Sequence, residues 1–237
     1  MRVAPDELPR RLEGDLPPAI LLFGDEPLLI EESARRVRRC AAERGFTDRI
    51  PLSAESGFDW GRLAGSSQTL SLFSQRRLID LRLPTGRPGE AGTAAFEAYS
   101  AAADPDVCLL VSTGRLDSRV KQSKWVKALD AGGWTVEHRA LNTGQFNAWF
   151  RRRLRERGLL LENEMVERMC HYLEGNLLAA AQEIDRLALF AGPDGSVERE
   201  TISRELVDHA RFNAFAAVDA CLQGDTHKAL RILKVLR

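Results

Sequence analysis

The stretch Pro18-Ala19-Ile20-Leu21-Leu22-Phe23-Gly24, followed at once by Asp25-Glu26-Pro27, decides the fold of this chain. Its uncharged apolar run indicates a strand that is buried on both faces, as strands of parallel sheets are. The acidic residues and the proline that follow are a helix-start signal. Residues 28–45 then carry apolar side chains at helical spacing and end at Gly45. This part of the chain therefore predicts a buried strand, a glycine turn and a helix.

The same alternation continues through about residue 140. Further strands are predicted at residues 50–52, 77–83, 107–111 and 134–136, and helices at residues 59–63, 93–103 and 118–131. Strands that alternate with helices indicate an α/β domain built on a doubly wound parallel sheet. We therefore expect residues 1–140 to form one such domain.

From Leu141 onward the strand pattern is gone and helices are predicted throughout. Asn142-Thr143 is expected to cap the first of them, and Gly158 to stop it. Further helices are predicted at residues 162–173, 177–190 and 201–207. The second of these has one apolar face, made up of Leu178, Ala181, Ile184, Leu187 and Ala188. We expect residues 141–211 to form a small all-α lid domain. Helical patterns at residues 213–222 and 226–236 predict the start of a third domain, residues 212–237, that continues beyond Arg237.

A glycine turn between a strand and a helix is also the setting of a phosphate-binding loop. That loop needs G-x-x-x-x-G-K-[ST], which supplies backbone N–H groups and a lysine for phosphate and a hydroxyl for magnesium. Gly24 fits the first position, but Leu29, Ile30 and Glu31 replace the second glycine, the lysine and the hydroxyl residue. Several nearby carboxylates outweigh the roughly 1 kcal/mol that a helix dipole contributes to anion binding. The sequence thus predicts a nucleotide-binding type of fold with a degenerate loop that binds no nucleotide.

The carboxylates of an ATPase are missing as well. An ATPase of this architecture needs an apolar strand that ends in acidic residues, which hold magnesium and polarise water. The strand predicted at residues 77–83 ends in Leu83-Pro84, and the one at residues 107–111 ends in Ser112-Thr113. We therefore expect neither an intrinsic catalytic site nor a bound cofactor.

Composition argues against several other classes of protein. The 237 residues carry a formal net charge of zero, so the total charge draws the chain neither to nucleic acid nor to an anionic membrane. Its four cysteines and four histidines are scattered without ligand spacing, which argues against a metal site and favours reduced cysteines in a cytoplasmic protein. Residues 1–14 lack the apolar segment of a signal peptide, and no apolar run approaches the length of a membrane span.

An apolar cluster stands out at Ser67-Gln68-Thr69-Leu70-Ser71-Leu72-Phe73-Ser74, just before the basic pair Arg76-Arg77. On residue type alone, packing into the core is the more common fate of such leucine and phenylalanine side chains. Exposed apolar clusters rimmed by polar residues, however, usually mark interaction sites. The motifs quoted below for the rest of the chain reverse this order, and they favour the interpretation that the cluster binds a partner.

Lys121, Lys124 and Lys127 are spaced to share one face of a predicted helix, around Trp125. The face is either a contact for a phosphate backbone or a solvated surface above an inward-pointing Trp125, and the solvated surface is the more common outcome. A second basic segment lies at residues 151–157. A DNA-binding module that uses both segments is one alternative function, although zero net charge favours weak, non-specific binding and any such binding should fall steeply with salt.

Several short motifs also follow one another in a fixed order along nearly the whole chain. They are Leu21-Leu22-Phe23-Gly24-Asp25-Glu26-Pro27-Leu28-Leu29, Gly45-Phe46, Asp59-Trp60, Ser71-Leu72-Phe73, Gly175-Asn176-Leu177-Leu178-Ala179, Gln182-Glu183, Phe215, Val218-Asp219-Ala220 and Ala229-Leu230-Arg231-Ile232-Leu233. In this order they resemble the delta-subunit family of the bacterial DNA polymerase III clamp loader, a member of the AAA+ superfamily that has lost its ATPase.

An ATPase that uses an unconventional loop is the second alternative function.

The resemblance implies an AAA+-type α/β domain, a helical lid, and a C-terminal collar domain of which residues 212–237 supply only the first helices. It implies that the Ser-Leu-Phe element inserts into the hydrophobic pocket of the sliding clamp, the beta subunit, and that the subunit opens the clamp ring for loading onto primed DNA. By position, Leu72 and Phe73 are the anchors beside Ser71, and Leu70 is a third contact whose residue type varies.

The resemblance further implies that the chain is one part of the DNA polymerase III holoenzyme, a DNA-directed DNA polymerase and nucleotidyltransferase. Its implied partners are the gamma/tau and delta prime subunits, whose ATP drives it, and DNA in the full complex. Lys121, Lys124 and Lys127 are the candidate DNA-facing residues.

Overall fold

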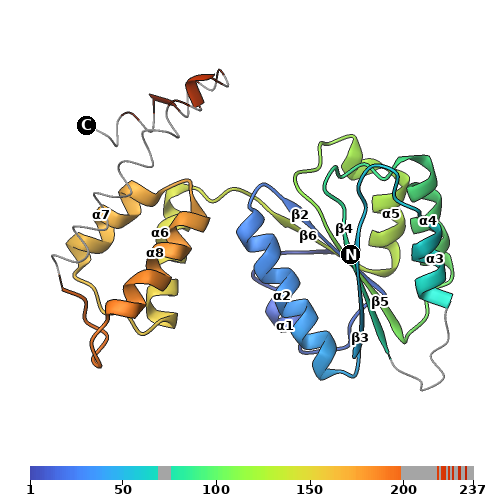
Figure 1. Ribbon diagram of the computed structural model, residues 1–237, viewed down its shortest axis with the longest axis horizontal. Coiled ribbons are helices and arrows are strands. Elements are labelled where there is room, and N and C mark those ends of the chain that lie inside the picture. The colour runs from blue at the N-terminus through green and yellow to red at the C-terminus, as the bar shows by residue number, and fades with distance from the viewer. Residues whose placement is uncertain are drawn as a thin grey trace. The chain divides into compact units, whose positions relative to one another are not determined.

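The computed structural model describes residues 1–68 and 76–198, together with residues 218, 220–222, 224, 226, 229, 230 and 233. The chain divides into two compact units, Met1–Ala140 and Leu141–Arg237 (Figure 1).

The first unit is an α/β domain whose six strands form one parallel sheet in the order β1-β6-β2-β5-β4-β3. The strands are β1 (Arg2–Val3), β2 (Ala19–Gly24), β3 (Asp48–Ser53), β4 (Arg77–Arg82), β5 (Val107–Ser112) and β6 (Trp134–His138). The helices are α1 (Leu8–Arg11), α2 (Pro27–Glu43), α3 (Gly61–Gln68), α4 (Gly89–Ala101), the 3-10 helix η1 (Val120–Gln122) and α5 (Lys124–Gly132). The predicted doubly wound parallel sheet is confirmed.

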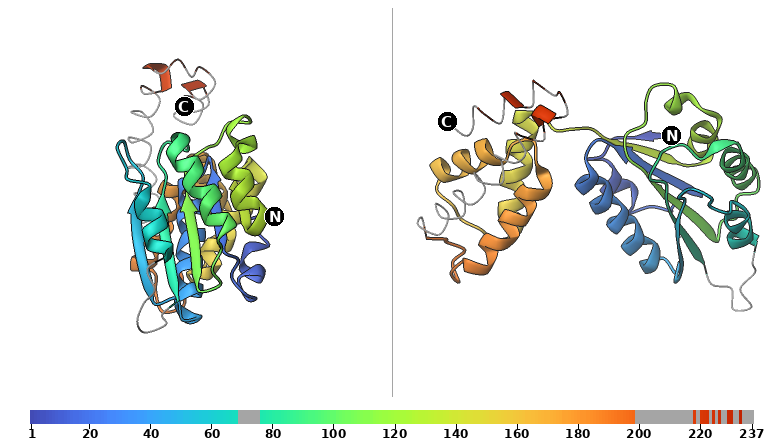
Figure 2. Two further views of the ribbon diagram at one scale, coloured as in Figure 1. Left: turned by 90° about the vertical axis from the view of Figure 1, so that its right-hand side faces the viewer. Right: turned by 45° about the horizontal axis from the view of Figure 1, so that its top comes forward.

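Helices cover both faces of this sheet, α1 and α2 on one side and α3, α4 and α5 on the other (Figures 1 and 2). Strand β2 contributes to both cores, because successive side chains of a strand point to opposite faces. Ile20 and Leu22 join the core under α2, whereas Leu21 and Phe23 join the core under α4 and α5. All four side chains are buried, which explains why the run at residues 18–23 has no polar alternation.

Strand β1 is the element of the sheet that the sequence did not predict. It pairs with β6 through Arg2 opposite Thr135 and Val3 opposite Val136. Two residues are too few to show a period, and the strand partner lies far along the chain. Because β1 forms the edge, β6 is an interior strand although it comes last in the chain.

The helix predicted at residues 118–131 is wrong in its first half. Residues Val120–Gln122 form the 3-10 helix η1, and α5 begins only at Lys124. Ser123 between them has an extended backbone, with φ −66° and ψ 161°, which ends the one helix and starts the next. Lys121 therefore does not lie on the same helix as Lys124 and Lys127.

The second unit is helical in the part that the structure describes, with α6 (Thr143–Glu156), α7 (Asn163–Leu173) and α8 (Leu177–Phe190). The predicted cap of α6 is confirmed: the Gln145 N–H donates to Asn142 Oδ1 at 2.9 Å, and the Asn142 N–H donates to Gln145 Oε1 at 3.1 Å. This reciprocal pair is a capping box, which satisfies two backbone donors at a helix start.

One face of α8 differs from the prediction. Leu177, Ala181, Ile184 and Leu187 are buried, but Leu178 is 55% exposed. The apolar run at residues 177–181 fits either of two neighbouring faces, so spacing alone could not choose between them. The predicted helix at residues 201–207 lies outside the described residues, and of those at 213–222 and 226–236 only scattered helical positions are described. Within the described part of the chain, every helix is too short or too polar to cross a membrane.

A buried carboxylate ties α2 to the edge of the sheet. Asp80 in β4 is only 5% exposed, and its Oδ2 accepts from Arg38 Nε in α2 at 2.8 Å and from Arg49 Nη2 in β3 at 2.6 Å. A buried charge is tolerated only where it is paired and hydrogen-bonded. Asp80 thus fixes three elements of the domain at one point.

Replacing Asp80 by asparagine is expected to lower the free energy of unfolding by about 2–3 kcal/mol. The loss stays below that of a deeply buried pair, since both arginines keep access to water. Urea unfolding of the chain measures it. The matched control is Asp106→Asn, which removes an exposed carboxylate 3.0 Å from Arg76 and should cost at most about 1 kcal/mol. Equal losses in the two variants would contradict the assignment.

Candidate functional site

The loop that joins β2 to α2 is closed by the neighbouring strand ends. The Gly24 N–H donates to the Gly114 carbonyl at 3.3 Å, and the Asp25 and Glu26 N–H groups donate to the His138 carbonyl at 2.8 and 3.4 Å. A phosphate-binding loop keeps such N–H groups free for phosphate oxygens. Here the first N–H groups of the loop are already used by the protein itself.

Gly24 makes this closure possible. Its φ is +147°, and a Cβ atom at this position would lie 2.0 Å from the carbonyl oxygen of His138. Glycine tolerates this backbone conformation and leaves room for the carbonyl. In this chain the first glycine of the loop therefore serves the close approach of β2 and β6.

The other degenerate positions are occupied by structural contacts. Ile30 is buried in the core under α2, and Leu29 is half-buried. Glu31 is exposed and its Oε1 accepts from Arg38 Nη1 at 2.8 Å. The places of a phosphate-binding lysine and a magnesium-binding hydroxyl are thus taken by a core residue and by an ion pair.

The loop carries two acidic side chains, Asp25 and Glu26. Asp25 pairs with Arg115 at 3.5 Å. Partial burial, together with the neighbouring Asp25 carboxylate, raises the pKa of Glu26. Sequence reasoning missed Arg115, because nothing local connects residue 115 with residue 25.

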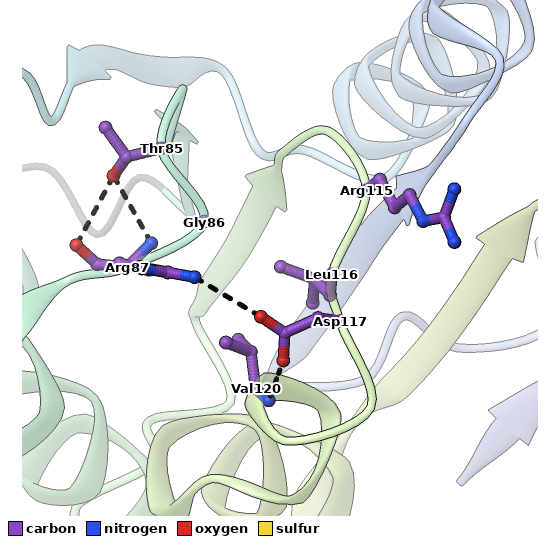
Figure 3. A pocket seen from close by; sticks show the side chains of 7 residues that line it. All are labelled: Thr85, Gly86, Arg87, Arg115, Leu116, Asp117 and Val120. Atoms are coloured by element: carbon purple, nitrogen blue, oxygen red, sulfur yellow. Dashed lines mark hydrogen bonds and ion pairs between the residues drawn. The ribbon is translucent and has the colours of Figure 1, made fainter.

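A pocket of about 430 Å³ lies at the carboxyl ends of β4 and β5, between the loops that follow these strands (Figure 3). Arg87 Nη2 and Asp117 Oδ2 approach to 3.3 Å across it, and the Arg115 side chain is directed away from this pair (Figure 3). The Thr85 hydroxyl interacts with the backbone of Arg87, and Asp117 Oδ1 accepts the Val120 N–H at 2.8 Å.

The charges of this pocket are balanced within its own walls. Hydrogen bonds from the Val120 backbone and from Arg87 hold the pKa of Asp117 below its usual value. Leu83 and Thr113, which follow the two strands, are buried and supply no carboxylate. Among the described residues, no group of three or more histidine, cysteine, aspartate or glutamate side chains is arranged to hold a metal ion.

His138 lies at the end of β6, beneath the closed loop. It is 3% exposed, and neither ring nitrogen has a hydrogen-bond partner. Burial lowers the pKa of His138 to about 4, although the carboxylate of Glu32 opposes this. The imidazole is therefore neutral at pH 7. The residue that receives the loop N–H groups through its carbonyl thus also places an uncharged ring in the core.

Acid is expected to destabilise the domain through His138. An unburied histidine has a pKa of about 6.5, and the folded value is about 4. Because folding disfavours the imidazolium, the contribution of His138 is complete above pH ~6.5 and is lost as the pH falls toward ~4. The loss is on the order of 3 kcal/mol in the free energy of unfolding.

The measurement is urea unfolding of the chain and of His138→Phe across this pH range. The variant cannot acquire the ring charge, so its stability should fall less steeply than that of the unmodified chain. Carboxylates titrate in both proteins and cancel in the difference. Parallel curves would show that His138 is not held neutral.

The apolar residues predicted to contact a partner, Leu70, Ser71, Leu72 and Phe73, lie outside the described residues. Helix α3 ends at Gln68, two residues before Leu70 in the sequence. The start of α3 is fixed by Asp59, whose Oδ1 accepts the Gly61 N–H at 2.9 Å, and by the buried Leu63. The first turn of the helix that precedes this segment in the chain is therefore docked on the core.

The three candidate DNA-facing lysines do not form one free face. Lys121 Nζ pairs with Glu137 Oε1 at 2.5 Å and lies 5.5 Å from the ring centroid of Phe23. Lys124 and Lys127 are exposed on α5, on either side of the buried Trp125. Only these two remain available for a phosphate backbone.

The basic segment of α6 is largely compensated inside its own unit. Arg151 pairs with Glu167 at 3.8 Å and Arg152 with Glu156 at 3.6 Å, and Arg157, just after the helix, pairs with Asp185 at 2.7 Å. Positive charges that are paired in this way attract phosphate less strongly, which weakens the case for a DNA-binding helix.

The fold and the closed loop define a class of protein: an AAA+-type α/β domain with a degenerate phosphate loop, followed by a helical unit. Solved structures support the fold. The AMPPCP-bound DnaA from Aquifex aeolicus aligns with a TM-score of 0.54 at 17% identity, over 87% of this chain and 66% of that chain. The Bacillus subtilis DNA clamp loader delta protein aligns with a TM-score of 0.61 at 20% identity, over 98% of this chain and 71% of that chain.

Sequence comparison resolves the family. The family model described as "DNA polymerase III, delta subunit" matches residues 20–138. The DNA polymerase III subunit delta of Escherichia coli (strain K12) is 32% identical over 237 residues, which is 100% of this chain and 69% of that protein. The chain therefore belongs to the DNA polymerase III delta subunit family. This membership assigns it to the clamp loader of the DNA polymerase III holoenzyme, to DNA replication, and to an assembly with other clamp-loader components.

Proposed function

We propose that the chain binds the sliding clamp, the beta subunit, through Leu70, Ser71, Leu72 and Phe73, and that it opens the clamp ring for loading onto primed DNA. The observation that carries the proposal is family membership over the full length of the chain. The docked start of α3 supports it, because a fixed helix leads directly to this segment.

The apolar anchors account for only part of the affinity. Burying Leu70, Leu72 and Phe73 contributes about 1.5–3 kcal/mol each. Association and the ordering of side chains cost several kcal/mol in return. The segment alone therefore gives modest affinity, and the surface around it must add contacts with the clamp.

Ring opening needs a further condition. A binding protein shifts the clamp between closed and open states only by the difference in its affinity for the two. The chain must therefore bind the edge of the open ring more tightly than the closed ring. The gamma/tau and delta prime subunits are the proposed neighbours in the loader, and residues 212–237 are the proposed start of the collar that joins them.

We further infer that the chain hydrolyses no ATP itself. The N–H groups of Gly24, Asp25 and Glu26 donate to protein carbonyls, and Ile30 is a core residue. In the full loader, Lys124 and Lys127 are the proposed contacts to DNA, since both are exposed on α5.

Truncating the two anchors should abolish most clamp binding. Leu72→Ala and Phe73→Ala together remove the side chains that fill the clamp pocket, and hot-spot truncations cost at least about 2 kcal/mol each. The expected loss is about thirtyfold in Kd for each residue. Surface plasmon resonance with a purified bacterial sliding clamp measures it, with the thermal midpoint as the check on folding.

The helical unit supplies a matched control. Leu189 and Phe190 are a second leucine–phenylalanine pair of the sequence, and their side chains are 82% and 57% exposed. Leu189→Ala with Phe190→Ala makes the same chemical change elsewhere and should leave clamp affinity unchanged. If the Leu72/Phe73 variant unfolds instead, those side chains belong to the core. If the unmodified chain binds no clamp, the proposed function is wrong.

ATP is expected to show no saturable binding to the chain up to about 1 mM, as measured by isothermal titration calorimetry. Two causes can prevent ATP binding: loop N–H groups that are already bonded, and the negative charge of Asp25 and Glu26. The variant Asp25→Asn/Glu26→Gln separates them, since it removes the carboxylates but leaves the N–H groups bonded to His138. It should not bind ATP either. Saturable binding by the unmodified chain would overturn the closed-loop argument and favour the alternative function of an ATPase.

A further inference from the structure

Helix α3 is held at its start by an aromatic ring seated on a glycine. The Trp60 indole meets the Phe58 ring edge-on at 5.1 Å and the Phe96 ring at 5.4 Å. A Cβ atom on Gly92 of α4 would lie 2.5 Å from Trp60 Cζ2 and 2.5 Å from Pro88 Cβ. The indole therefore occupies the space that any other residue at position 92 would fill.

The backbone conformation at position 92 does not require a glycine. Gly92 lies inside α4, where glycine is less favourable than alanine, and its φ is not in the left-handed region. The space it leaves is taken up by Trp60 and Pro88. Gly92 lowers the stability of α4, and it is explained by the space that it leaves for Trp60, next to the start of α3.

The seat is continuous with the core of the domain. The Phe96 ring stacks on Trp125 of α5 at 5.4 Å with an interplanar angle of 30°, and both side chains are buried. Leu63, in the first turn of α3, is also buried in this core. A line of aromatic rings therefore connects the start of α3 with α4 and α5.

We propose that Trp60, seated on Gly92, is a positioning residue for the clamp-binding segment that follows α3. The inference rests on the proposed function. The helix has 8 residues, so at about 1.5 Å per residue it is a lever of about 12 Å, and a tilt of ~10° at Trp60 moves its far end by ~2 Å. Displacements of this size are enough to misplace a binding site.

Binding to the clamp depends on such positioning in two ways. The apolar anchors must enter their pocket together, and a fixed helix lowers the ordering cost of binding. Trp60 touches no clamp in this scheme. It acts by setting where the segment begins, which distinguishes it from the anchors Leu72 and Phe73.

The test is a set of four proteins: Gly92→Ala, Trp60→Phe, the double variant, and Gly132→Ala as control. A Cβ atom at Gly132 meets nothing within 4 Å, so this control adds the same methyl group to a helix without a clash. Two quantities are measured on the full chain: Kd for a purified bacterial sliding clamp, and amide hydrogen exchange along α3 compared with β2 and β5.

Gly92→Ala is expected to weaken clamp binding about tenfold and to speed exchange in α3 at least about tenfold, while β2 and β5 stay protected. Trp60→Phe alone should weaken binding about fivefold, because the smaller ring leaves the seat partly empty. In the double variant the smaller ring relieves the contact with Trp60, while the contact with Pro88 Cβ remains, so affinity and protection of α3 should recover in part, above the values of Gly92→Ala. Gly132→Ala should change neither quantity.

Unchanged affinity and unchanged exchange in Trp60→Phe would overturn the inference, as would a double variant no better than Gly92→Ala. Loss of protection in β2 and β5 along with α3 would also overturn it, since Trp60 would then serve general stability. Failure of the proposed function has a separate signature, because it requires the unmodified chain to bind no clamp or the Leu72/Phe73 variant to bind normally.

Discussion

The close approach of β2 to β6 at Gly24 is the constraint on which the functional edge of this domain depends. One carbonyl, that of His138, accepts two consecutive loop N–H groups, and the missing Cβ of Gly24 gives it the room. Opening the loop to a phosphate would break these hydrogen bonds next to a buried, neutral imidazole. The loop therefore keeps the strand–turn–helix geometry of a nucleotide site but serves as a structural joint between two strands.

Other contacts of the α/β domain also hold its helices and strands together without a ligand. The Asp80 carboxylate holds α2 to β3 and β4, and the core on the other face holds α3, α4 and α5. The sheet is thereby clamped on both faces by contacts that need no ligand. The pocket beyond β4 and β5 is spanned by its own ion pair. At the loop and at this pocket, the polar groups of the described residues bind one another.

How much the sequence could predict depended on whether the signal was local. The run at residues 18–23 is apolar without interruption, which is typical of a strand covered on both faces, so the sequence predicted this strand. The degenerate loop was also predicted, because the missing lysine and hydroxyl are sequence facts. Strand β1, the Asp25–Arg115 pair and the burial of Asp80 were missed, since each depends on a partner far away in the chain. The seat at Gly92 was missed for the same reason: a glycine in an alanine-rich helix shows no sign of the indole against it.

In the proposed function, in which the chain hydrolyses no ATP itself, it acts on the clamp ring only through differential binding. For the proposed function, this differential binding requires the clamp-binding domain to be a rigid body, because a deformable domain would adapt to the closed ring instead of favouring the open one. The α/β domain has the features of such a rigid body. Its sheet is buried on both faces, its buried charge is paired, and its aromatic rings link three helices. Lys121 and Arg157, in contrast, are paired within their own units, so in the proposed role apolar shape carries clamp recognition, and Lys124 and Lys127 remain exposed for DNA.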